Sequence, residues 1–279
     1  MLINYIEKSN MIHLSGLSDF SLKDILECGQ SFRFVHQSDG SFEGVVGDNL
    51  VKVKQDGDNL FFYDCNMDFY TGTLQTYFAL DVDYKGIKQI LSQDDMLKKM
   101  IEYAPGIRVM HQDLWETLCT FIISQNNNIK RITGIVDRFC TLYGEKLHGY
   151  DDKYMFPTSK RISELTVEDM APLRAGFRAK YLIDAAKKVE NGEVNLDLVR
   201  SSDIEKGREI LQLIYGVGPK VAECTLLFGA GKMEAFPLDV WMKRAMATLF
   251  PNGLPDFALP YAGIAQQYIF HYARMTKIE

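Results

Sequence analysis

The sequence lacks the features of secreted and membrane-spanning proteins. No run of about 18 apolar residues occurs among its 279 residues, so no transmembrane helix is expected. The N-terminal stretch has neither a long apolar core nor a small-residue cleavage site, which argues against a secretory signal. We therefore expect a cytoplasmic protein that is not attached to a membrane.

Cysteine is scarce and widely spaced. The five cysteines form no Cys-x-x-Cys pair, which excludes zinc-ribbon and thioredoxin-like sites. We expect reduced thiols that act as small buried hydrophobes, and no metal site. The cysteines are Cys28, Cys65, Cys119, Cys140 and Cys224.

An excess of positive charge is also missing, since the formal net charge is −6. The charge is unevenly distributed. Residues 1–103 contain 9 Lys and Arg against 16 Asp and Glu, whereas residues 104–279 contain 22 against 21. The second part could present a basic face, so the net charge neither supports nor excludes binding to nucleic acid.

The first part of the chain has the pattern of strands. Between residues 12 and 64, short apolar alternations are separated by clusters of Gly, Asp, Ser and Asn, which predicts an antiparallel meander. Residues 17–28 and 85–103 have a helical pattern and are expected to cover one sheet face. The predicted strands are 31–35, 42–46, 50–54 and 60–63.

From about residue 104 the apolar period becomes helical. The sequence thus predicts an α+β protein, with an antiparallel sheet domain at 1–103 followed by an all-α region at 104–279. The predicted helices are 113–124, 129–143, 166–174, 179–191, 205–214, 221–228, 240–249 and 259–275.

The most informative stretch is LIYGVGPKVAEC, residues 213–224, within a helical hairpin at 205–230. Gly216 and Gly218 permit a tight turn with positive φ, and Pro219 suits the first turn of the next helix. The amides there, including that of Val221, form an anion site suited to a DNA phosphate. The alternative is an ordinary corner between two helices.

Lys220 lies in the first turn of that helix, where the helix dipole opposes a positive charge. That position suits an amine that must be neutral to act as a nucleophile. The alternative is a solvated lysine that only contacts phosphate. Nineteen residues later, Asp239 precedes the predicted helix 240–249 and is either a simple N-cap or a carboxylate held at a cleft.

Gly-Val-Gly-x-Lys followed by Pro-x-Asp-Val resembles the helix-hairpin-helix "GPD" superfamily of DNA glycosylases. In that superfamily a lysine at this position marks the members that also cleave the strand. The cysteine-rich tail that holds an iron–sulfur cluster in some branches is absent, because no cysteine follows Cys224.

Four further segments resemble 8-oxoguanine DNA glycosylases, so the resemblance covers nearly the whole chain. It implies a TATA-binding-protein-like sheet before the helices. It also implies a monomer that binds double-stranded DNA containing 8-oxoguanine, without a cofactor, and that associates with the nucleoid if the source is bacterial. The segments are CGQSFRF (28–34), YFALDVD (77–83), SQNNNIKRITGIVDRFC (124–140) and GFRAKY (176–181).

The resemblance implies that a flipped 8-oxoguanine is read by four residues. The carbonyl of Gly29 accepts the N7 hydrogen, which normal guanine lacks. Cys224 and Phe270 enclose the base, and Gln266 reads its Watson–Crick edge. Core packing is the alternative for Phe270, and a buried thiol for Cys224.

The resemblance implies that Asn126 fills the space that the flipped base leaves opposite cytosine. Arg131 and Arg178 contact the orphaned cytosine, and Phe177 wedges into the stack. Without the resemblance, Asn126 is equally well a helix cap and the arginines are surface cations. Phe177 replaces the family's tyrosine, and Trp241 replaces a phosphate-contacting histidine of vertebrate-type members. These departures affect phosphate contacts and opposite-base discrimination.

The implied reaction is attack of Lys220 on the sugar, with Asp239 stabilising the positive charge, followed by β-elimination at the 3′ side. Two other functions remain open. An alkylpurine glycosylase on the same scaffold would lack the lysine. A non-catalytic DNA-binding module would use the hairpin alone.

Overall fold

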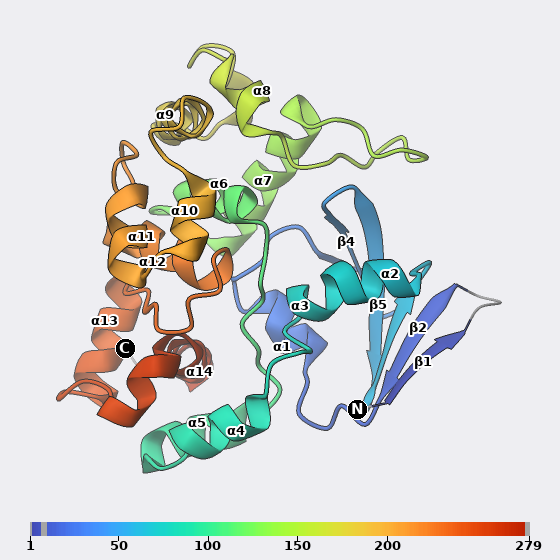
Figure 1. Ribbon diagram of the computed structural model, residues 1–279, viewed down its shortest axis with the longest axis vertical. Coiled ribbons are helices and arrows are strands. Elements are labelled where there is room, and N and C mark those ends of the chain that lie inside the picture. The colour runs from blue at the N-terminus through green and yellow to red at the C-terminus, as the bar shows by residue number, and fades with distance from the viewer. Residues whose placement is uncertain (1, 7–9, 277–279) are drawn as a thin grey trace.

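The computed structural model describes residues 2–6 and 10–276. Its first part is a six-stranded antiparallel sheet, and the rest of the described chain is helical (Figure 1). The predicted α+β fold, with the sheet preceding the helices, is confirmed. The strand order is β1 (Leu2–Ile6), β2 (Met11–Ser15), β6 (Asn59–Tyr63), β5 (Asn49–Asp56), β4 (Phe42–Val46) and β3 (Val35–His36).

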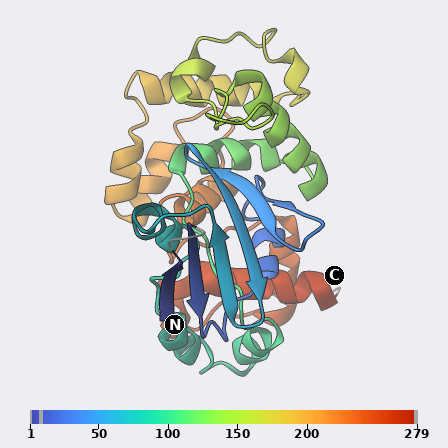
Figure 2. The same ribbon diagram turned by 90° about the vertical axis from the view of Figure 1, so that its right-hand side faces the viewer.

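One face of the sheet is buried because its strands alternate apolar and polar residues. The cross-strand row Ile12, Phe62 and Val53 is fully buried. Helix α1 (Leu22–Glu27) covers this face together with the continuous helical segment α2 (Met67–Phe69), η2 (Tyr70–Leu74) and α3 (Gln75–Tyr77). Figure 2 shows the strands in front, with the helical region above and behind them.

The segment 85–103 does not cover the sheet, contrary to our expectation. It forms two helices, α4 (Tyr84–Leu91) and α5 (Asp95–Tyr103), because Asp94 caps the second by accepting from the amides of Met96 and Leu97. Both helices contribute to the core of the helical region. They pack against η4 (Asp256–Tyr261) and α14 (Ala262–Thr276).

The centre of the helical region is α6 (Leu114–Ser124), which is buried along most of its length and packs on α12 (Pro219–Phe228). Its apolar residues occur on all sides, as expected for a central helix. The elements around it are α7 (Ile129–Tyr143), α8 (Ser159–Ser163), η3 (Ala171–Leu173), α9 (Arg178–Glu190), α10 (Leu196–Ser201), α11 (Ile204–Leu211) and α13 (Val240–Leu249).

Two predicted elements were wrong. Residues 31–34 are not a strand, and only Val35–His36 pairs with β4. Residues 166–174 form turns and the short η3 instead of a helix. Thr166 and Asp169 bond each other's amides, and Pro172 removes a donor. The sequence analysis did not predict β1, α2–α3, α8 or α10.

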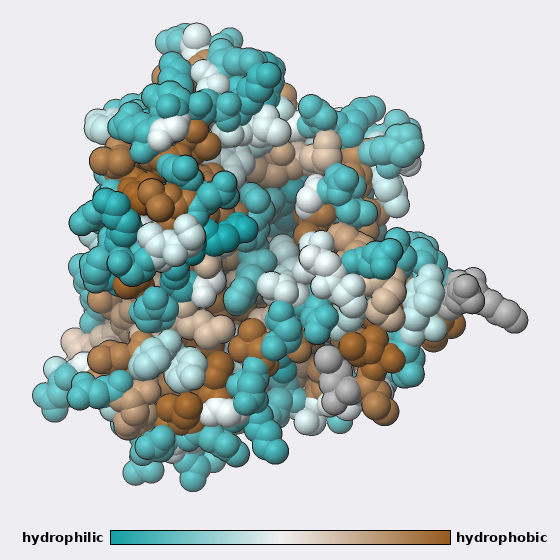
Figure 3. All heavy atoms as spheres, viewed as in Figure 1, coloured by the Kyte–Doolittle hydropathy of each residue, from teal (hydrophilic) through white to brown (hydrophobic). Residues whose placement is uncertain are grey.

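Hydrophilic side chains cover much of the face in Figure 3, with smaller hydrophobic patches among them. No helix within residues 2–6 and 10–276 is long and apolar enough to cross a membrane. The boundary near residue 103 remains a prediction.

Candidate active site

The predicted hairpin forms from α11, a turn and α12. Gly216 has φ +83°, and a Cβ there would lie 2.5 Å from the Tyr181 ring, so only glycine fits. Gly218 differs from the prediction, because it has the extended backbone of an N-cap rather than a positive φ. Pro219 begins α12, and the amide of Val221 lies in the first turn, where helix donors are unpaired within the helix.

Lys220 projects from the first turn of α12 toward α6. Its Nζ donates to Oγ of Ser124 at 3.2 Å and lies 5.0 Å from the centre of the Phe121 ring. Lys220 is partly exposed, whereas Ser124 and Phe121 are buried. The amine therefore has a fixed position against an aromatic face. The sequence analysis missed Ser124 and Phe121, because only the packing of α6 on α12 brings them to the lysine.

Asp239 is the N-cap of α13, and its Oδ1 accepts the amide of Met242 at 2.7 Å. The same side chain lines a cavity with Lys220. The two interpretations of Asp239 are thus compatible, because the cap fixes the carboxylate at the cavity wall.

The cavity has a volume of about 70 Å³ and gathers residues that are far apart in the sequence. A groove of about 490 Å³ shares Gly29, Lys220, Asp239 and Phe270 with it and adds Trp241. Trp241 therefore lies beside the candidate site. The cavity is lined by Cys28, Gly29, Phe121, Lys220, Cys224, Phe228, Pro237, Asp239, Gln266, Gln267 and Phe270.

Gly29 has φ +91°, and a Cβ there would lie 3.2 Å from Cδ1 of Ile129. The next residue, Gln30, is only 1% exposed and anchors this loop. Its Nε2 donates to the carbonyls of Ile25 and Arg108, and its Oε1 accepts the amide of Met110. The position of the Gly29 peptide is thus determined by buried hydrogen bonds.

The other predicted base-recognition residues meet at the same cavity. Burial raises the pKa of the Cys224 thiol to about 11, although the nearby Lys220 lowers it, so Cys224 stays protonated at neutral pH. Phe270 contacts Trp241 edge to face, with 6.0 Å between ring centres. Gln266 donates from Nε2 to the carbonyl of Pro237 at 3.2 Å.

Residues 125–128 form a partly exposed loop between α6 and α7. Asn128 caps α7 by accepting the amide of Arg131, so the capping role belongs to Asn128 rather than Asn126. Asn126 is exposed with φ +48°. The guanidinium of Arg178 donates to the carbonyls of Gln125 and Asn126, and Arg178 is only 3% exposed. It holds the loop rather than projecting from the surface.

Phe177, the predicted wedge residue, is 46% exposed. Its ring contacts Tyr181 edge to face, and Tyr181 contacts Tyr215 of the hairpin turn in the same way. Arg131 is also exposed, and its guanidinium donates to Oδ1 of Asn127. The aromatic row thus joins the predicted wedge to the predicted phosphate site.

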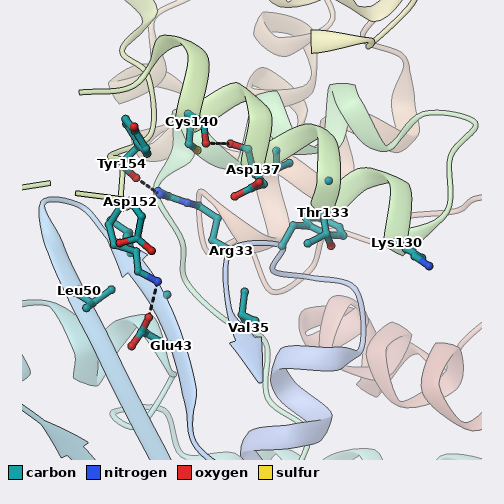
Figure 4. Close-up of a pocket in the computed structure, with 17 residues that line it drawn as sticks. Arg33, Val35, Glu43, Leu50, Lys130, Thr133, Asp137, Cys140, Asp152 and Tyr154 are labelled. Atoms are coloured by element: carbon teal, nitrogen blue, oxygen red, sulfur yellow. Dashed lines mark hydrogen bonds and ion pairs between the residues drawn. The ribbon is translucent and has the colours of Figure 1, made fainter. Parts of the chain in front are cut away.

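A separate cavity of about 490 Å³ lies between the sheet and α7 (Figure 4). Arg33 pairs with Glu116 of α6 at 3.4 Å and donates to the carbonyl of Tyr154, while Lys153 pairs with Glu43 of β4 at 2.6 Å. Burial raises the pKa of Glu116. These contacts connect the sheet domain with the helical region and contain none of the predicted site residues.

Within the part of the chain that the structure describes, no group of three or more His, Cys, Asp and Glu side chains could hold a metal ion. The absence of a cofactor remains a prediction. A helical hairpin whose second helix carries a lysine, with that lysine and a carboxylate at one cavity, is the arrangement of a helix-hairpin-helix DNA glycosylase.

Comparisons with known proteins agree. Residues 14–118 match the family model of the 8-oxoguanine DNA glycosylase N-terminal domain. Residues 119–253 match that of the HhH-GPD superfamily base excision DNA repair protein. The chain belongs to the 8-oxoguanine DNA glycosylase family.

Individual relatives support this assignment. The N-glycosylase/DNA lyase of Saccharomyces cerevisiae is 34% identical over 81% of this chain and 67% of its own length. The chain thus spans about two thirds of the length of this relative and of the N-glycosylase/DNA lyase of Arabidopsis thaliana. The Clostridium acetobutylicum 8-oxoguanine glycosylase/lyase, solved with double-stranded DNA containing cytosine opposite 8-oxoguanine, is 37% identical, with a TM-score of 0.91 over 100% of this chain and 99% of that one. A complex of MBOgg1 with a low-affinity DNA ligand is 40% identical, with a TM-score of 0.92 over 99% and 100%.

Proposed function

We propose that this protein excises 8-oxoguanine from duplex DNA in base excision repair and then cleaves the strand through its lyase activity. The observation that carries the proposal is that Lys220 and Asp239 share one cavity with Gly29, Gln266 and Phe270. The names of its relatives, which are glycosylase/lyases, support the same activity.

In the proposed reaction, neutral Lys220 attacks C1′ of the deoxyribose as the bond to the base breaks. The electron pair of that bond leaves with the base, and the carboxylate of Asp239 stabilises the positive charge on the sugar. Ring opening gives a Schiff base, which acidifies the C2′ proton. Loss of that proton expels the 3′ phosphate, and hydrolysis then releases Lys220. Lys220 already contacts Ser124, so it is positioned before DNA binds.

Recognition of the base follows from its hydrogen-bonding groups. The anchored Gly29 carbonyl accepts N7–H of 8-oxoguanine and repels the N7 lone pair of guanine. Cys224, protonated at neutral pH, and Phe270 flank the ring, and Gln266 contacts the Watson–Crick edge. A cavity of about 150 Å³ holds a benzene ring, so the cavity of about 70 Å³ must widen when a purine enters.

On the opposite strand, we assign Asn126 to the vacated space and Arg131 to the orphaned cytosine, since both are exposed. Phe177 wedges into the stack. Arg178 supports Asn126 by donating to its backbone carbonyl. To contact cytosine, Arg178 must break a hydrogen bond of this kind and form one with the base. The backbone amides of Gly216, Gly218 and Val221 bind a phosphate. We further propose that the protein acts as a monomer in the cytoplasm.

Trapping with borohydride tests the lysine mechanism. Reduction should cross-link the wild-type protein to duplex DNA containing 8-oxoguanine, and Lys220→Gln should abolish the adduct. Lys146→Gln is the matched control, because Lys146 is an exposed lysine that does not line the cavity. Absence of a wild-type adduct would contradict the mechanism and favour an alkylpurine glycosylase or a non-catalytic module. An adduct undiminished in Lys220→Gln would show that another amine is the nucleophile.

Asp239→Asn separates the two roles of Asp239. An asparagine can still cap α13, so folding and DNA binding should persist while base release slows by at least about 100-fold. Single-turnover excision and fluorescence anisotropy with an abasic duplex measure the two properties. Equal loss of both would show that Asp239 is structural.

A further inference from the structure

Two consecutive glutamines of α14 line the candidate base cavity. Gln266 is 4% exposed and Gln267 is 5% exposed, so both amides need partners inside the protein. Nε2 of Gln267 donates to Oε1 of Gln266 at 2.6 Å, and Nε2 of Gln266 donates to the carbonyl of Pro237. The amide of Gln266 is therefore held on both sides.

Gln267 is oriented by a second contact. Its Oε1 lies 3.5 Å from Sγ of Cys28, which shares its single thiol hydrogen between Gln267 and the carbonyl of Ile25 at 3.3 Å. Burial raises the pKa of Cys28 to about 11, so the thiol keeps its proton at neutral pH. Cys28 precedes Gly29 and accepts a hydrogen bond from Gln30. The hydrogen bonds from Cys28 to Gln267 and from Gln267 to Gln266 thus connect the loop that carries Gly29 to Gln266, the residue proposed to contact the Watson–Crick edge.

The orientation of an amide determines which base edge it can match. The oxygen of the Gln266 amide faces Gln267 and its nitrogen faces Pro237. One lone pair on the oxygen and one hydrogen on the nitrogen remain free for a base, and their relative positions are set by these two contacts. The guanine edge offers an acceptor at O6 beside a donor at N1. The adenine edge offers the reverse, a donor at N6 beside an acceptor at N1. A fixed amide can match only one of these orders.

We propose that Gln267 is a positioning residue for base specificity: by fixing the amide of Gln266, it makes the cavity reject 8-oxoadenine in favour of 8-oxoguanine. This inference rests on the proposed function. Both oxidised purines carry a hydrogen on N7 and an oxygen on C8, so the carbonyl of Gly29 does not distinguish them. The discrimination must then come from the Watson–Crick edge, and Gln266 performs it only while Gln267 prevents its amide from turning over.

The test compares excision of 8-oxoguanine and 8-oxoadenine, each opposite cytosine, in single-turnover assays. Gln267→Met retains the approximate volume and removes both polar groups. Gln267→Glu retains the length and the acceptors but removes the donor. In both variants, the excision rate of 8-oxoguanine divided by that of 8-oxoadenine should fall by about tenfold, because one orienting hydrogen bond is lost. In a Lys220→Gln background, the ratio of dissociation constants for the two duplexes should fall similarly.

Tyr268→Phe is the matched control. It removes a buried hydrogen bond from the same helix, between Tyr268 and the carbonyl of Ile107, without altering the cavity lining. Its rate ratio should equal that of the wild type. If Gln267→Glu or Gln267→Met folds and keeps the wild-type ratio, Gln267 only packs, and the inference is refuted. A wild-type protein that does not excise 8-oxoguanine would instead refute the proposed function.

Discussion

Replacement of Gly29 by alanine tests the proposed base contact. The added Cβ would lie 3.2 Å from Cδ1 of Ile129, at the wall of a cavity of about 70 Å³. The backbone at φ +91° disfavours a side chain, which costs roughly 1–2 kcal/mol of folding stability. Because each kcal/mol shifts the Tm of a domain of similar size by about 2–4 °C, we expect a decrease of a few degrees.

The effect on activity should be larger than the effect on stability. The methyl group occupies space that the flipped base needs, and overpacking of this kind costs about 1–3 kcal/mol. We therefore expect single-turnover excision of 8-oxoguanine to slow by roughly 10–100-fold. Binding to a duplex with an abasic site should change little, because no base then enters the cavity.

Gly149→Ala separates strain from obstruction. Gly149 has φ +84°, and no atom lies within 4 Å of the position that its Cβ would take. It should lose a similar amount of stability and keep full activity. If Gly29→Ala slows excision no more than Gly149→Ala does, the Gly29 peptide does not face the base.

Two further predictions concern stability. Arg178→Ala should lower the free energy of unfolding by about 2–3 kcal/mol in urea titrations, because it removes charged hydrogen bonds from the carbonyls of Gln125 and Asn126; unchanged stability with altered cytosine preference would contradict this role. Burial raises the pKa of the Cys224 thiol to about 11. Above pH 9 this thiol therefore binds more protons in the folded protein than in the unfolded chain. The stability that the thiol contributes is complete below pH 9 and should be lost between pH 9 and 11. Cys224→Ala should lose less stability than the wild type over that interval in thermal melts, and an equal loss would argue against the buried thiol.

Local sequence patterns predicted the strands and helices whose apolar period is strong. Strands β4, β5 and β6 and helices α6, α7 and α13 all lie where the pattern placed them. The failures occurred where short-range polar contacts replace regular hydrogen bonding. Residues 166–174 turn because Thr166 and Asp169 bond each other's backbone amides, and neither residue is apolar.

The surface against which a correctly predicted helix packs was harder to infer. Helices α4 and α5 were expected on the sheet, yet α4 packs against η4 and α5 against α14, in the C-terminal part of the chain. An amphipathic helix specifies that one face is buried, but not which surface buries it. That choice depends on long-range packing, which periodicity does not encode.

The sequence by itself determined which residues are predicted to carry the chemistry of the candidate site. The positions of Lys220 and Asp239 at predicted helix starts left their roles open. The resemblance of the motifs around them implied a nucleophile, a carboxylate partner and a substrate class. Only the tertiary structure decided their partners. Ser124 and Phe121 meet Lys220, and Gln267 meets Gln266 and Cys28, through the packing of α6, α12, α14 and the Gly29 loop. Those contacts join residues far apart in the chain, and they exist only once the core has formed.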